Sequence, residues 1–305
     1  MKRSLPKVRC KILVICGGGI FGCIPAHFLG MLPAADQGLE GVNVLSGCSI
    51  GGILAAAYAT GLPFSHIDHV FQTRAKECFC KRFMAKINPL AVPTYRNDTL
   101  DAVIKDMLGD TRMYEVRRTY PGLSLIIPAL DLTDDKYLVF DNIRGNHEDV
   151  PLRDIAGMTS AAPSYYDARE YEGHCVVDGG LIEVSPLFTT VTTVKRHLRI
   201  PFVDMDVLML GTGRDIDEKP ITPKVYNGLG LYGMAKDILV PYATLGNELA
   251  TREWGENLGL GSFTYFNPIE TNGALDDVKL IPSLIEQADT FREDFLRVWK
   301  EWLDR

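Results

Sequence analysis

The sequence lacks any run of apolar residues long enough to cross a bilayer, which takes about 20 of them. It also lacks an excess of positive charge, because 32 Lys and Arg residues stand against 39 Asp and Glu and the formal net charge is −7. A balance of this sign argues against nucleic-acid binding. It argues equally against docking on anionic lipid by charge alone, so any membrane contact would be mainly apolar.

Disulfide bonds and targeting signals are not indicated either. The seven cysteines are odd in number and scattered, which is typical of buried free thiols in a reducing cytosol. Cys78 and Cys80 have no second pair or nearby histidine to complete a metal site. The basic opening, residues 1–9, is followed by an apolar run too short for a signal peptide. We therefore expect a cytoplasmic protein without a bound metal, for which peripheral membrane contact stays open.

Four segments in the first 60 residues alternate between strand and helix patterns. Short apolar runs rich in branched side chains predict strands at Lys11–Cys16 and Val42–Ser46. Phe21–Leu32, with Pro25 near its start, and the small-residue segment Gly52–Thr60 predict helices. This alternation predicts an α/β fold around a mostly parallel, buried sheet.

The rest of the chain continues without an internal repeat or an obvious linker. Residues 62–108 are predicted to be largely helical, and apolar residues at helical spacing predict an amphipathic helix over Ile281–Arg305. Further strands are predicted at Leu123–Leu130, Tyr137–Asp141, His174–Val177 and Val207–Leu210. We expect residues 1–305 to form one domain, with the motifs in residues 11–215 and a helical part in residues 216–305.

The pattern Gly47-Cys48-Ser49-Ile50-Gly51 lies between the second predicted strand and the second predicted helix. A nucleophilic serine on so tight a turn needs small neighbours, because the backbone approaches itself there. Its Oγ would stand exposed near the positive end of the following helix. An ordinary glycine turn with a capping serine explains the pattern about as well. The choice between the two interpretations therefore depends on the other motifs of the chain.

A glycine loop, Gly17-Gly18-Gly19-Ile20-Phe21-Gly22, joins the first predicted strand to the first predicted helix. Consecutive glycines let backbone N–H groups point into one concavity, which suits the oxyanion of an acyl-transfer reaction. A nucleotide phosphate loop is the competing interpretation. No acidic residue ends the next strand cleanly, however, and the serine turn would crowd a ribose. Gly22 is followed by Cys23 rather than by a phosphate-binding lysine.

The third motif, Asp178-Gly179-Gly180, follows another predicted strand and would leave a carboxylate at the edge of the sheet. Alone it is a common Asp-Gly turn. Histidines favour a Ser–Asp pair over a triad, because only His197 follows Asp178 and it lies in a basic, surface-like segment. We therefore expect Asp178 itself to accept the proton of Ser49.

Together these three motifs, in this order, resemble those of the patatin-like phospholipase family. Two further segments are similar to the family's pattern, Thr159–Pro163 before the aspartate and Leu210–Gly213 after it. The chain departs from that pattern at Cys16, at Phe21 and at Val184–Pro186. None of these departures removes Ser49 or Asp178.

The resemblance implies a three-layer α/β/α fold and a catalytic dyad of Ser49 and Asp178. It implies an oxyanion hole from the amides of Gly17, Gly18 and Gly19, with Gly22, Gly47, Gly51, Gly179 and Gly180 as motif residues. The activity implied is hydrolysis of acyl esters of phospholipids or related lipids at a membrane or micelle surface, of the phospholipase A or lysophospholipase type, without metal or organic cofactor. Whether an activator is needed stays open.

Two other functions fit the same motifs. An acyltransferase could use the same elbow with a distant histidine, and a lipid-binding or storage protein could keep the scaffold without turnover. For the acyl chain itself, the segment Phe79–Leu90, with Phe83, Met84 and Ile87, is a candidate groove wall, although core packing explains most of its side chains equally well.

Overall fold

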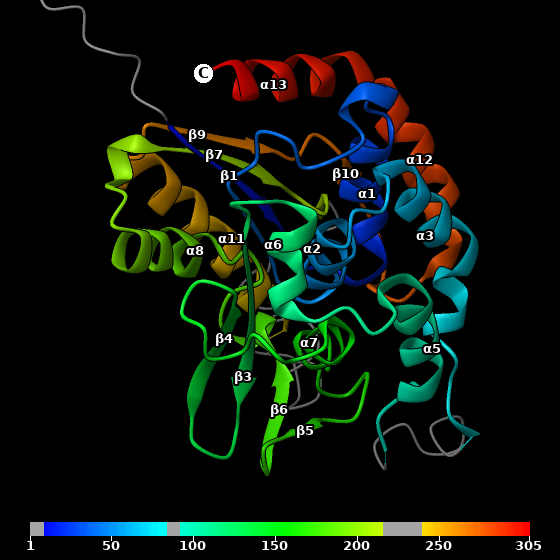
Figure 1. The fold of residues 1–305 in the computed structure, drawn as a ribbon. Helices are drawn as coiled ribbons and strands as arrows, with labels where there is room; N and C mark the ends of the chain where they lie inside the picture. The colour runs from blue at the N-terminus through cyan, green and yellow to red at the C-terminus, as the bar shows by residue number, and fades with distance from the viewer. Residues whose placement is uncertain (1–8, 84–91, 216–239) are drawn as a thin grey trace, which may run out of the picture.

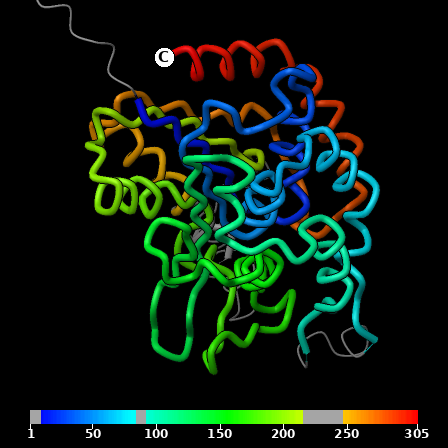
Figure 2. The backbone as a smooth tube through the Cα atoms, in the orientation of Figure 1, coloured from blue at the N-terminus to red at the C-terminus, as the bar shows by residue number. Residues whose placement is uncertain are grey.

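The computed structural model describes residues 9–83, 92–215 and 240–305 (Figures 1 and 2). Its centre is an eight-stranded sheet in the order β5-β6-β3-β2-β1-β7-β9, with β4 paired to β3. The strands are β1 (Cys10–Ile15), β2 (Val44–Gly47), β3 (Ser124–Asp131), β4 (Lys136–Asp141), β5 (Arg169–Tyr171), β6 (His174–Asp178), β7 (Met205–Leu210) and β9 (Ser262–Phe266). A separate small pair joins β8 (Arg214–Asp215) and β10 (Glu270–Thr271).

Most neighbouring strands of the central sheet run parallel. β1 pairs in parallel with β2 and β7, β2 with β3, and β7 with β9, whereas β4, β5 and β6 pair antiparallel. Every residue of β1, β2 and β7 is buried, as expected for strands covered by helices on both faces. The expected mixed α/β fold with a mostly parallel sheet is confirmed.

Helices cover both faces of this sheet (Figure 1). The α-helices are α1 (Cys23–Gly30), α2 (Ile50–Ala59), α3 (Phe64–Cys78), α5 (Asn97–Leu108), α6 (Val116–Thr119), α7 (Leu152–Thr159), α8 (Leu187–Thr193), α11 (Val240–Asn257), α12 (Ile281–Thr290) and α13 (Arg292–Asp304). Short turns of other helix types include η1 (Gly19–Gly22), η4 (Gly179–Leu181) and the π-helical η5 (Val194–Leu198), which continues α8.

The buried apolar residues form two clusters, one on each face of the sheet. Along β1, Leu13 and Ile15 belong to the larger cluster and Ile12 and Val14 to the smaller one. This alternation is the two-residue period of a strand with both faces covered. Side chains of α1, α2, α3, α12 and α13 fill the larger cluster, and those of α8 fill the smaller one. The result is a three-layer α/β/α arrangement.

The C-terminal part, for which a helical character is expected, contains a strand as well as helices. β9 lies within it and adds a parallel strand beside β7. The tail forms two helices rather than one, because the backbone leaves helical geometry at Phe291. The second of them is anchored at Trp302, whose indole N–H donates to the Asp206 carbonyl and whose own carbonyl accepts from the buried Lys11 ammonium at 2.6 Å.

The structure bears on two features expected from the sequence, the lack of a membrane-crossing segment and the candidate groove wall for the acyl chain. Within the described ranges, no helix combines the length and the apolar content that a membrane crossing requires. In the candidate groove wall, Phe83 is 75% exposed, and Met84 and Ile87 lie outside the described residues.

A histidine clamps three helices of the larger cluster together. The imidazole of His27 on α1 contacts Asp68 on α3 through Nδ1 at 2.9 Å and Asp289 on α12 through Nε2 at 3.3 Å. Partial burial disfavours the charged ring, but the hydrogen bonds and attraction of the two carboxylates outweigh it, so the pKa of His27 is raised.

We predict that His27 stabilises the fold most at acid pH. A raised folded-state pKa gives stability that is fully present below the unfolded-state pKa of about 6.5 and is lost as the pH rises through the folded-state pKa. The His27→Gln variant should therefore lose more melting temperature relative to the parent at pH 5.5 than at pH 9. His66→Gln, at an exposed position on α3, is the control. An equal loss at both pH values would contradict the prediction.

Candidate active site

Ser49 lies on the sharp turn between β2 and α2. Its backbone has φ 55° and ψ −125°, which is uncommon for a residue with a side chain and is typical of a nucleophile elbow. The turn is possible because Gly47 packs against the Gly51 carbonyl and Gly51 against the Ile15 carbonyl, where any side chain would collide. Ser49 therefore sits at the N-terminal, electropositive end of α2.

The sheet brings Asp178 to this serine from 129 residues away. β3 pairs with β2 near Ser46 and with β6 near Asp178, so both turns lie against the same strand. The Ser49 hydroxyl donates to Asp178 Oδ2 at 2.6 Å, and the Gly180 amide donates to Oδ1 at 2.7 Å. The serine and aspartate singled out in the sequence are thus in direct contact.

Asp178 is buried, with 5% of its residue surface exposed. Burial raises its pKa to about 6, although hydrogen bonds from Ser49, Gly180 and Cys48 act in the opposite direction. Burial and the charge of Asp178 raise the pKa of the Cys48 thiol, which stays protonated and points at Asp178 Oδ1 from 3.8 Å. A carboxylate with a pKa near neutrality is suited to accept and return a proton.

Thr159, the last residue of α7, links the serine turn to β3 through its hydroxyl group. Its hydroxyl accepts from the Ser49 amide at 3.0 Å and donates to the Pro128 carbonyl on β3 at 2.6 Å. The side chain is fully buried. The Ser49 amide is thereby occupied and is not free to bind an oxyanion.

The glycine loop lies next to the serine, because Gly17 packs against the Ser49 side chain. The Gly17 amide donates to the Val184 carbonyl at 2.8 Å, and the Gly17 carbonyl accepts from the Thr212 hydroxyl at 2.7 Å. Within the described residues, no acceptor is found for the amides of Gly18 and Gly19. Of the three expected donors, Gly18 and Gly19 therefore remain available.

The other motif glycines are packing positions. A side chain at Gly22 would collide with Ile50, and one at Gly179 would press on the Pro128 carbonyl. Gly19 has φ 57°, a conformation that favours glycine, and it packs against the Leu275 carbonyl.

Several supporting residues were not singled out by the sequence. Asn247 on α11 donates to the Ile182 carbonyl at 2.6 Å and accepts from the Val184 amide at 3.0 Å, which fixes the segment after Asp178. The Leu275 carbonyl accepts from the Ile20 amide at 2.8 Å. Thr159 and Thr212 lie in segments with a recognised family pattern, but nothing in that pattern signals Asn247 or Leu275.

Histidines and metal-binding groups lie elsewhere. His174 contacts Asp131 at 2.8 Å, and His197 is exposed on η5. Asp131, Asp134 and His174 bring three ligand atoms within 4.8 Å of one another at the β3–β4 turn. Asp134 also pairs with Lys136 at 2.6 Å, so these groups already have protein partners.

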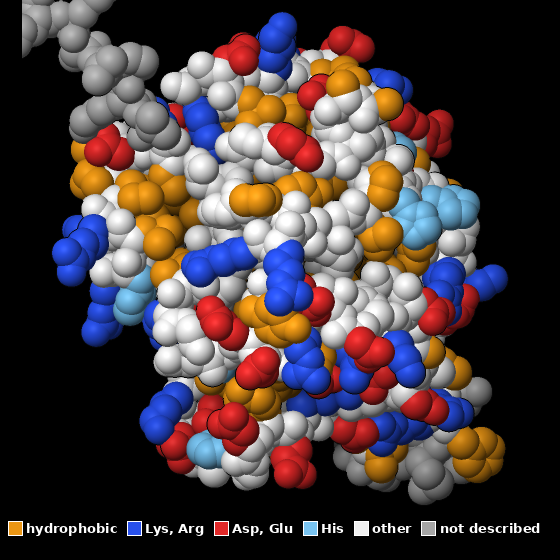
Figure 3. Space-filling model, in the orientation of Figure 1, with side chains coloured by type: hydrophobic (Ala, Val, Ile, Leu, Met, Phe, Trp, Pro, Cys, Tyr) orange, Lys and Arg blue, Asp and Glu red, His pale blue; other side chains and the backbone are white. Residues whose placement is uncertain are grey.

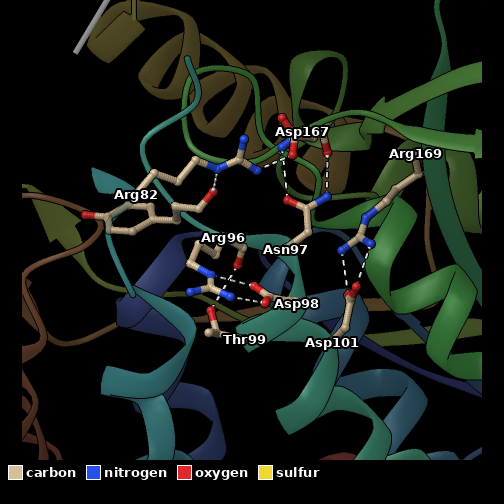
Figure 4. Close-up of polar contacts among 9 residues, drawn as sticks. Arg82, Arg96, Asn97, Asp98, Thr99, Asp101, Asp167 and Arg169 are labelled. Carbon is tan, nitrogen blue, oxygen red and sulfur yellow. Dashed lines mark hydrogen bonds and ion pairs between the residues drawn. The ribbon is translucent and has the colours of Figure 1, made fainter. Parts of the chain in front are cut away.

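Two cavities with charged residues in their lining flank α5. One, of about 440 Å³, is bordered by Arg82, Arg96 and Asp167, and another, of about 660 Å³, by Arg169 and α7. In Figure 4 each arginine points to a carboxylate: Arg82 to Asp167, Arg96 to Asp98 and Arg169 to Asp101. Because these guanidinium groups are already paired, the cavities offer little free positive charge for an anion.

The fold and the site define an α/β protein with a serine on a nucleophile-elbow turn, and sequence comparison identifies its family. Residues 13–191 match the family model for patatin-like phospholipase, which covers more than half of the chain. The protein therefore belongs to the patatin-like phospholipase family.

Named relatives align over most of the chain. The cGAMP-activated phospholipase of Escherichia coli (strain TW11681) is 28% identical over 91% of this chain and 85% of its own length. A cGAMP-activated phospholipase of Vibrio cholerae is 25% identical over 90% and 86%. Patatin-like protein 1 of Oryza sativa subsp. indica is 28% identical over 75% and 64%.

We predict that Thr159 positions the serine. Thr159→Val keeps the shape but leaves the buried Ser49 amide and Pro128 carbonyl without a partner, at a cost of about 1–3 kcal/mol each. We expect kcat for ester hydrolysis to fall at least about tenfold with KM changed less than about twofold. Thr159→Ser, which keeps the hydroxyl, should restore most of kcat. Equal loss in the Val and Ser variants would contradict this role.

Proposed function

We propose that the protein is a lipid acyl hydrolase of the phospholipase A or lysophospholipase type, with Ser49 as nucleophile and Asp178 as general base. The observation that carries the proposal is the 2.6 Å hydrogen bond from the Ser49 hydroxyl to the buried Asp178 carboxylate beside the glycine loop. Membership of a phospholipase family and the names of the bacterial relatives support the substrate class.

The reaction proceeds in two steps. Asp178 takes the hydroxyl proton as Ser49 Oγ attacks the ester carbonyl, and the amides of Gly18 and Gly19 stabilise the oxyanion. The tetrahedral intermediate collapses to an acyl-enzyme, and the leaving alcohol takes the proton back from Asp178. Asp178 then takes a proton from a water molecule, which attacks the acyl-enzyme, and returns that proton to Ser49 Oγ as the fatty acid leaves. This scheme uses no metal or organic cofactor.

The two rival functions make different demands on this site. An acyltransferase with a histidine base is disfavoured, because the described partners of Asp178 are Ser49, Gly180 and Cys48. A storage or binding protein has no need of a buried carboxylate 2.6 Å from a serine on a strained turn.

Regulation and location form part of the proposal. Because two relatives are named for activation by cGAMP, we propose that hydrolysis by this chain depends on a cyclic dinucleotide. Free cysteines support a cytoplasmic protein that reaches lipid at a membrane surface. We also propose that the chain works as one domain, since α11 and α13 both contact parts of the motif-bearing core.

The central test removes each member of the dyad. Ser49→Ala and Asp178→Asn should each lower hydrolysis of a p-nitrophenyl ester and of mixed phospholipids by about a thousandfold or more, while each variant still folds. Ser65→Ala and Asp135→Asn, at exposed positions, are the matched controls. Assays with and without added cGAMP keep a missing activator from hiding the reaction. If either dyad variant kept the parent rate, the assignment would be wrong.

The pH dependence tests Asp178 as the base. A base has to be ionised, so its raised pKa places the acid limb of kcat/KM near pH 6, where an ordinary aspartate would place it near pH 4. We expect kcat/KM to fall about tenfold per pH unit below that point, measured by fatty-acid release. Full activity down to pH 4.5 in a folded protein would exclude this role.

A further inference from the structure

A buried tyrosine that the proposed mechanism does not use lies two residues before α5. Tyr95 has 1% of its residue surface exposed. Its ring packs against the rings of Phe79, Tyr165 and Tyr166. Its hydroxyl donates a hydrogen bond to the carboxylate of Asp276, 181 residues further along the chain. Burial and this contact raise the pKa of Tyr95, so the phenol stays protonated and keeps donating.

The partner of this tyrosine belongs to the exposed turn that supports the glycine loop. Residues 272–275 are all exposed, and Asp276 follows them directly. The Leu275 carbonyl accepts from the Ile20 amide at 2.8 Å and lies against Gly19. A turn with so few buried side chains depends on individual hydrogen bonds for its position. The contact made by Asp276 is therefore one residue away from the group that supports the glycine loop.

On its other side, Tyr95 is joined to the segment that follows α7. Its amide donates to the Tyr165 carbonyl at 2.8 Å, and the preceding amide, of Thr94, donates to the Ser164 carbonyl at 2.9 Å. With its ring enclosed by three others and its backbone held at two points, Tyr95 has few alternative side-chain positions. Its hydroxyl is therefore a fixed donor.

The segment that follows α7 also contacts both members of the proposed dyad. It begins after Thr159, which accepts from the Ser49 amide. It contains Ala161, whose carbonyl accepts from the Asp178 amide at 3.1 Å. The Tyr95 hydroxyl thus connects the part of the chain that holds the dyad to the turn that supports the glycine loop.

Burial makes this contact better suited to the role than the ion pairs nearby. Charged side chains of both signs are interspersed over the region of Figure 3 where Figure 1 places α5. Exposed pairs there, such as Arg96 with Asp98, are weakened by water and contribute little. The Tyr95 hydroxyl is shielded from water, so its hydrogen bond to the Asp276 carboxylate is costly to leave unmade. Within the described ranges, no other side-chain hydrogen bond reaches residues 272–276.

We propose that Tyr95 is a positioning residue for the glycine loop, which it reaches through Asp276. Its hydroxyl fixes the supporting turn, and the turn keeps the amides of Gly18 and Gly19 where the oxyanion forms. The proposal rests on the proposed function, because it assigns Tyr95 a role in that reaction. Donors of an oxyanion hole act only when they are fixed at the position where charge develops. Loss of the hydroxyl should therefore slow the chemical step and leave substrate binding almost unchanged.

The first test separates the chemical step from substrate binding. In Tyr95→Phe, which keeps the ring, we expect kcat for hydrolysis of a p-nitrophenyl ester to fall about tenfold, with KM changed less than about twofold. Asp276→Ala should lose as much, and the double variant no more than either single one, because both remove the same contact. Asp276→Asn, whose amide oxygen can still accept, should retain most of kcat. Additive losses in the double variant would refute the role of this contact.

A second readout distinguishes positioning from a loss of folded protein. An alkyl trifluoromethyl ketone adds to the nucleophilic serine and forms an oxyanion like that of the intermediate, so its affinity depends on the glycine-loop amides. Its Ki should rise about tenfold in Tyr95→Phe, in step with the loss of kcat/KM. A smaller folded fraction would lower the rate without changing Ki. An unchanged Ki beside a reduced kcat would therefore overturn the proposal.

A third measurement needs no turnover. Hydrogen exchange followed by mass spectrometry reports on the Ile20 amide, whose hydrogen bond to Leu275 should open more often without the Tyr95 hydroxyl. We expect the peptide that contains Ile20 to exchange about tenfold faster in Tyr95→Phe. Unchanged exchange would contradict the proposal. Absence of hydrolysis in the parent would count against the proposed function alone, because exchange still decides whether Tyr95 holds the glycine loop.

Two matched variants serve as controls. Tyr114→Phe removes the hydroxyl of a tyrosine whose described side-chain contact is with Arg118 across its ring. Asp277→Asn changes the neighbouring carboxylate, which accepts from the Lys279 amide rather than from a tyrosine. Both should keep kcat, Ki and exchange within about twofold of the parent. Equal changes in Tyr95→Phe and Tyr114→Phe would overturn the proposal.

Discussion

The site depends on one short hydrogen bond, from the hydroxyl of Ser49 on its strained turn to the carboxylate of the buried Asp178. Neither partner would hold this state alone. The left-handed backbone of Ser49 is disfavoured for a side-chain-bearing residue, and an ionised aspartate is disfavoured by burial. The surrounding contacts compensate for both costs. The Thr159 hydroxyl accepts from the Ser49 amide, and the Gly180 amide donates to the Asp178 carboxylate. Gly47 and Gly51, which have no side chains, allow the close backbone approach that the turn requires.

β3 is the element that unites these contacts. Its first half pairs with β2 and its second half with β6, so the elbow and the aspartate turn are placed by the register of one strand. Pro128 in its middle offers a carbonyl to Thr159 and lies against Gly179. A shift of this register by one residue would turn the side chains of either partner strand to the opposite face. The geometry of the dyad is therefore a property of the sheet as much as of its loops.

Local pattern was enough to predict the first half of this architecture. β1, β2, α1 and α2 lie within a few residues of their expected positions, because buried parallel strands and small-residue helices have strong periodic signals. β9 was not predicted. It is an edge strand whose residues are all half-buried, so it lacks the continuous apolar run of a central strand. The tail was expected to be one helix. The break at Phe291 could not be predicted, because no glycine or proline lies there.

Within the site, chemistry was more predictable than connectivity. The serine and aspartate belong to residue patterns that a turn requires, and they are in contact. That the Gly17 amide is occupied could not be foreseen, because its acceptor, the Val184 carbonyl, is distant in sequence and any residue could supply it. The role of Asn247 could not be predicted from the sequence either, since a single asparagine on a helix is usually a surface residue.

These distant contacts bear on where the functional unit ends. The family match stops at residue 191, yet the glycine loop is held by Thr212 and Leu275, and the segment after the aspartate by Asn247. A polypeptide cut at the family boundary would retain Ser49 and Asp178 while losing groups that hold the glycine loop in place. Homologues that share only the motif-bearing half could therefore diverge in rate or substrate preference without altering any signature residue.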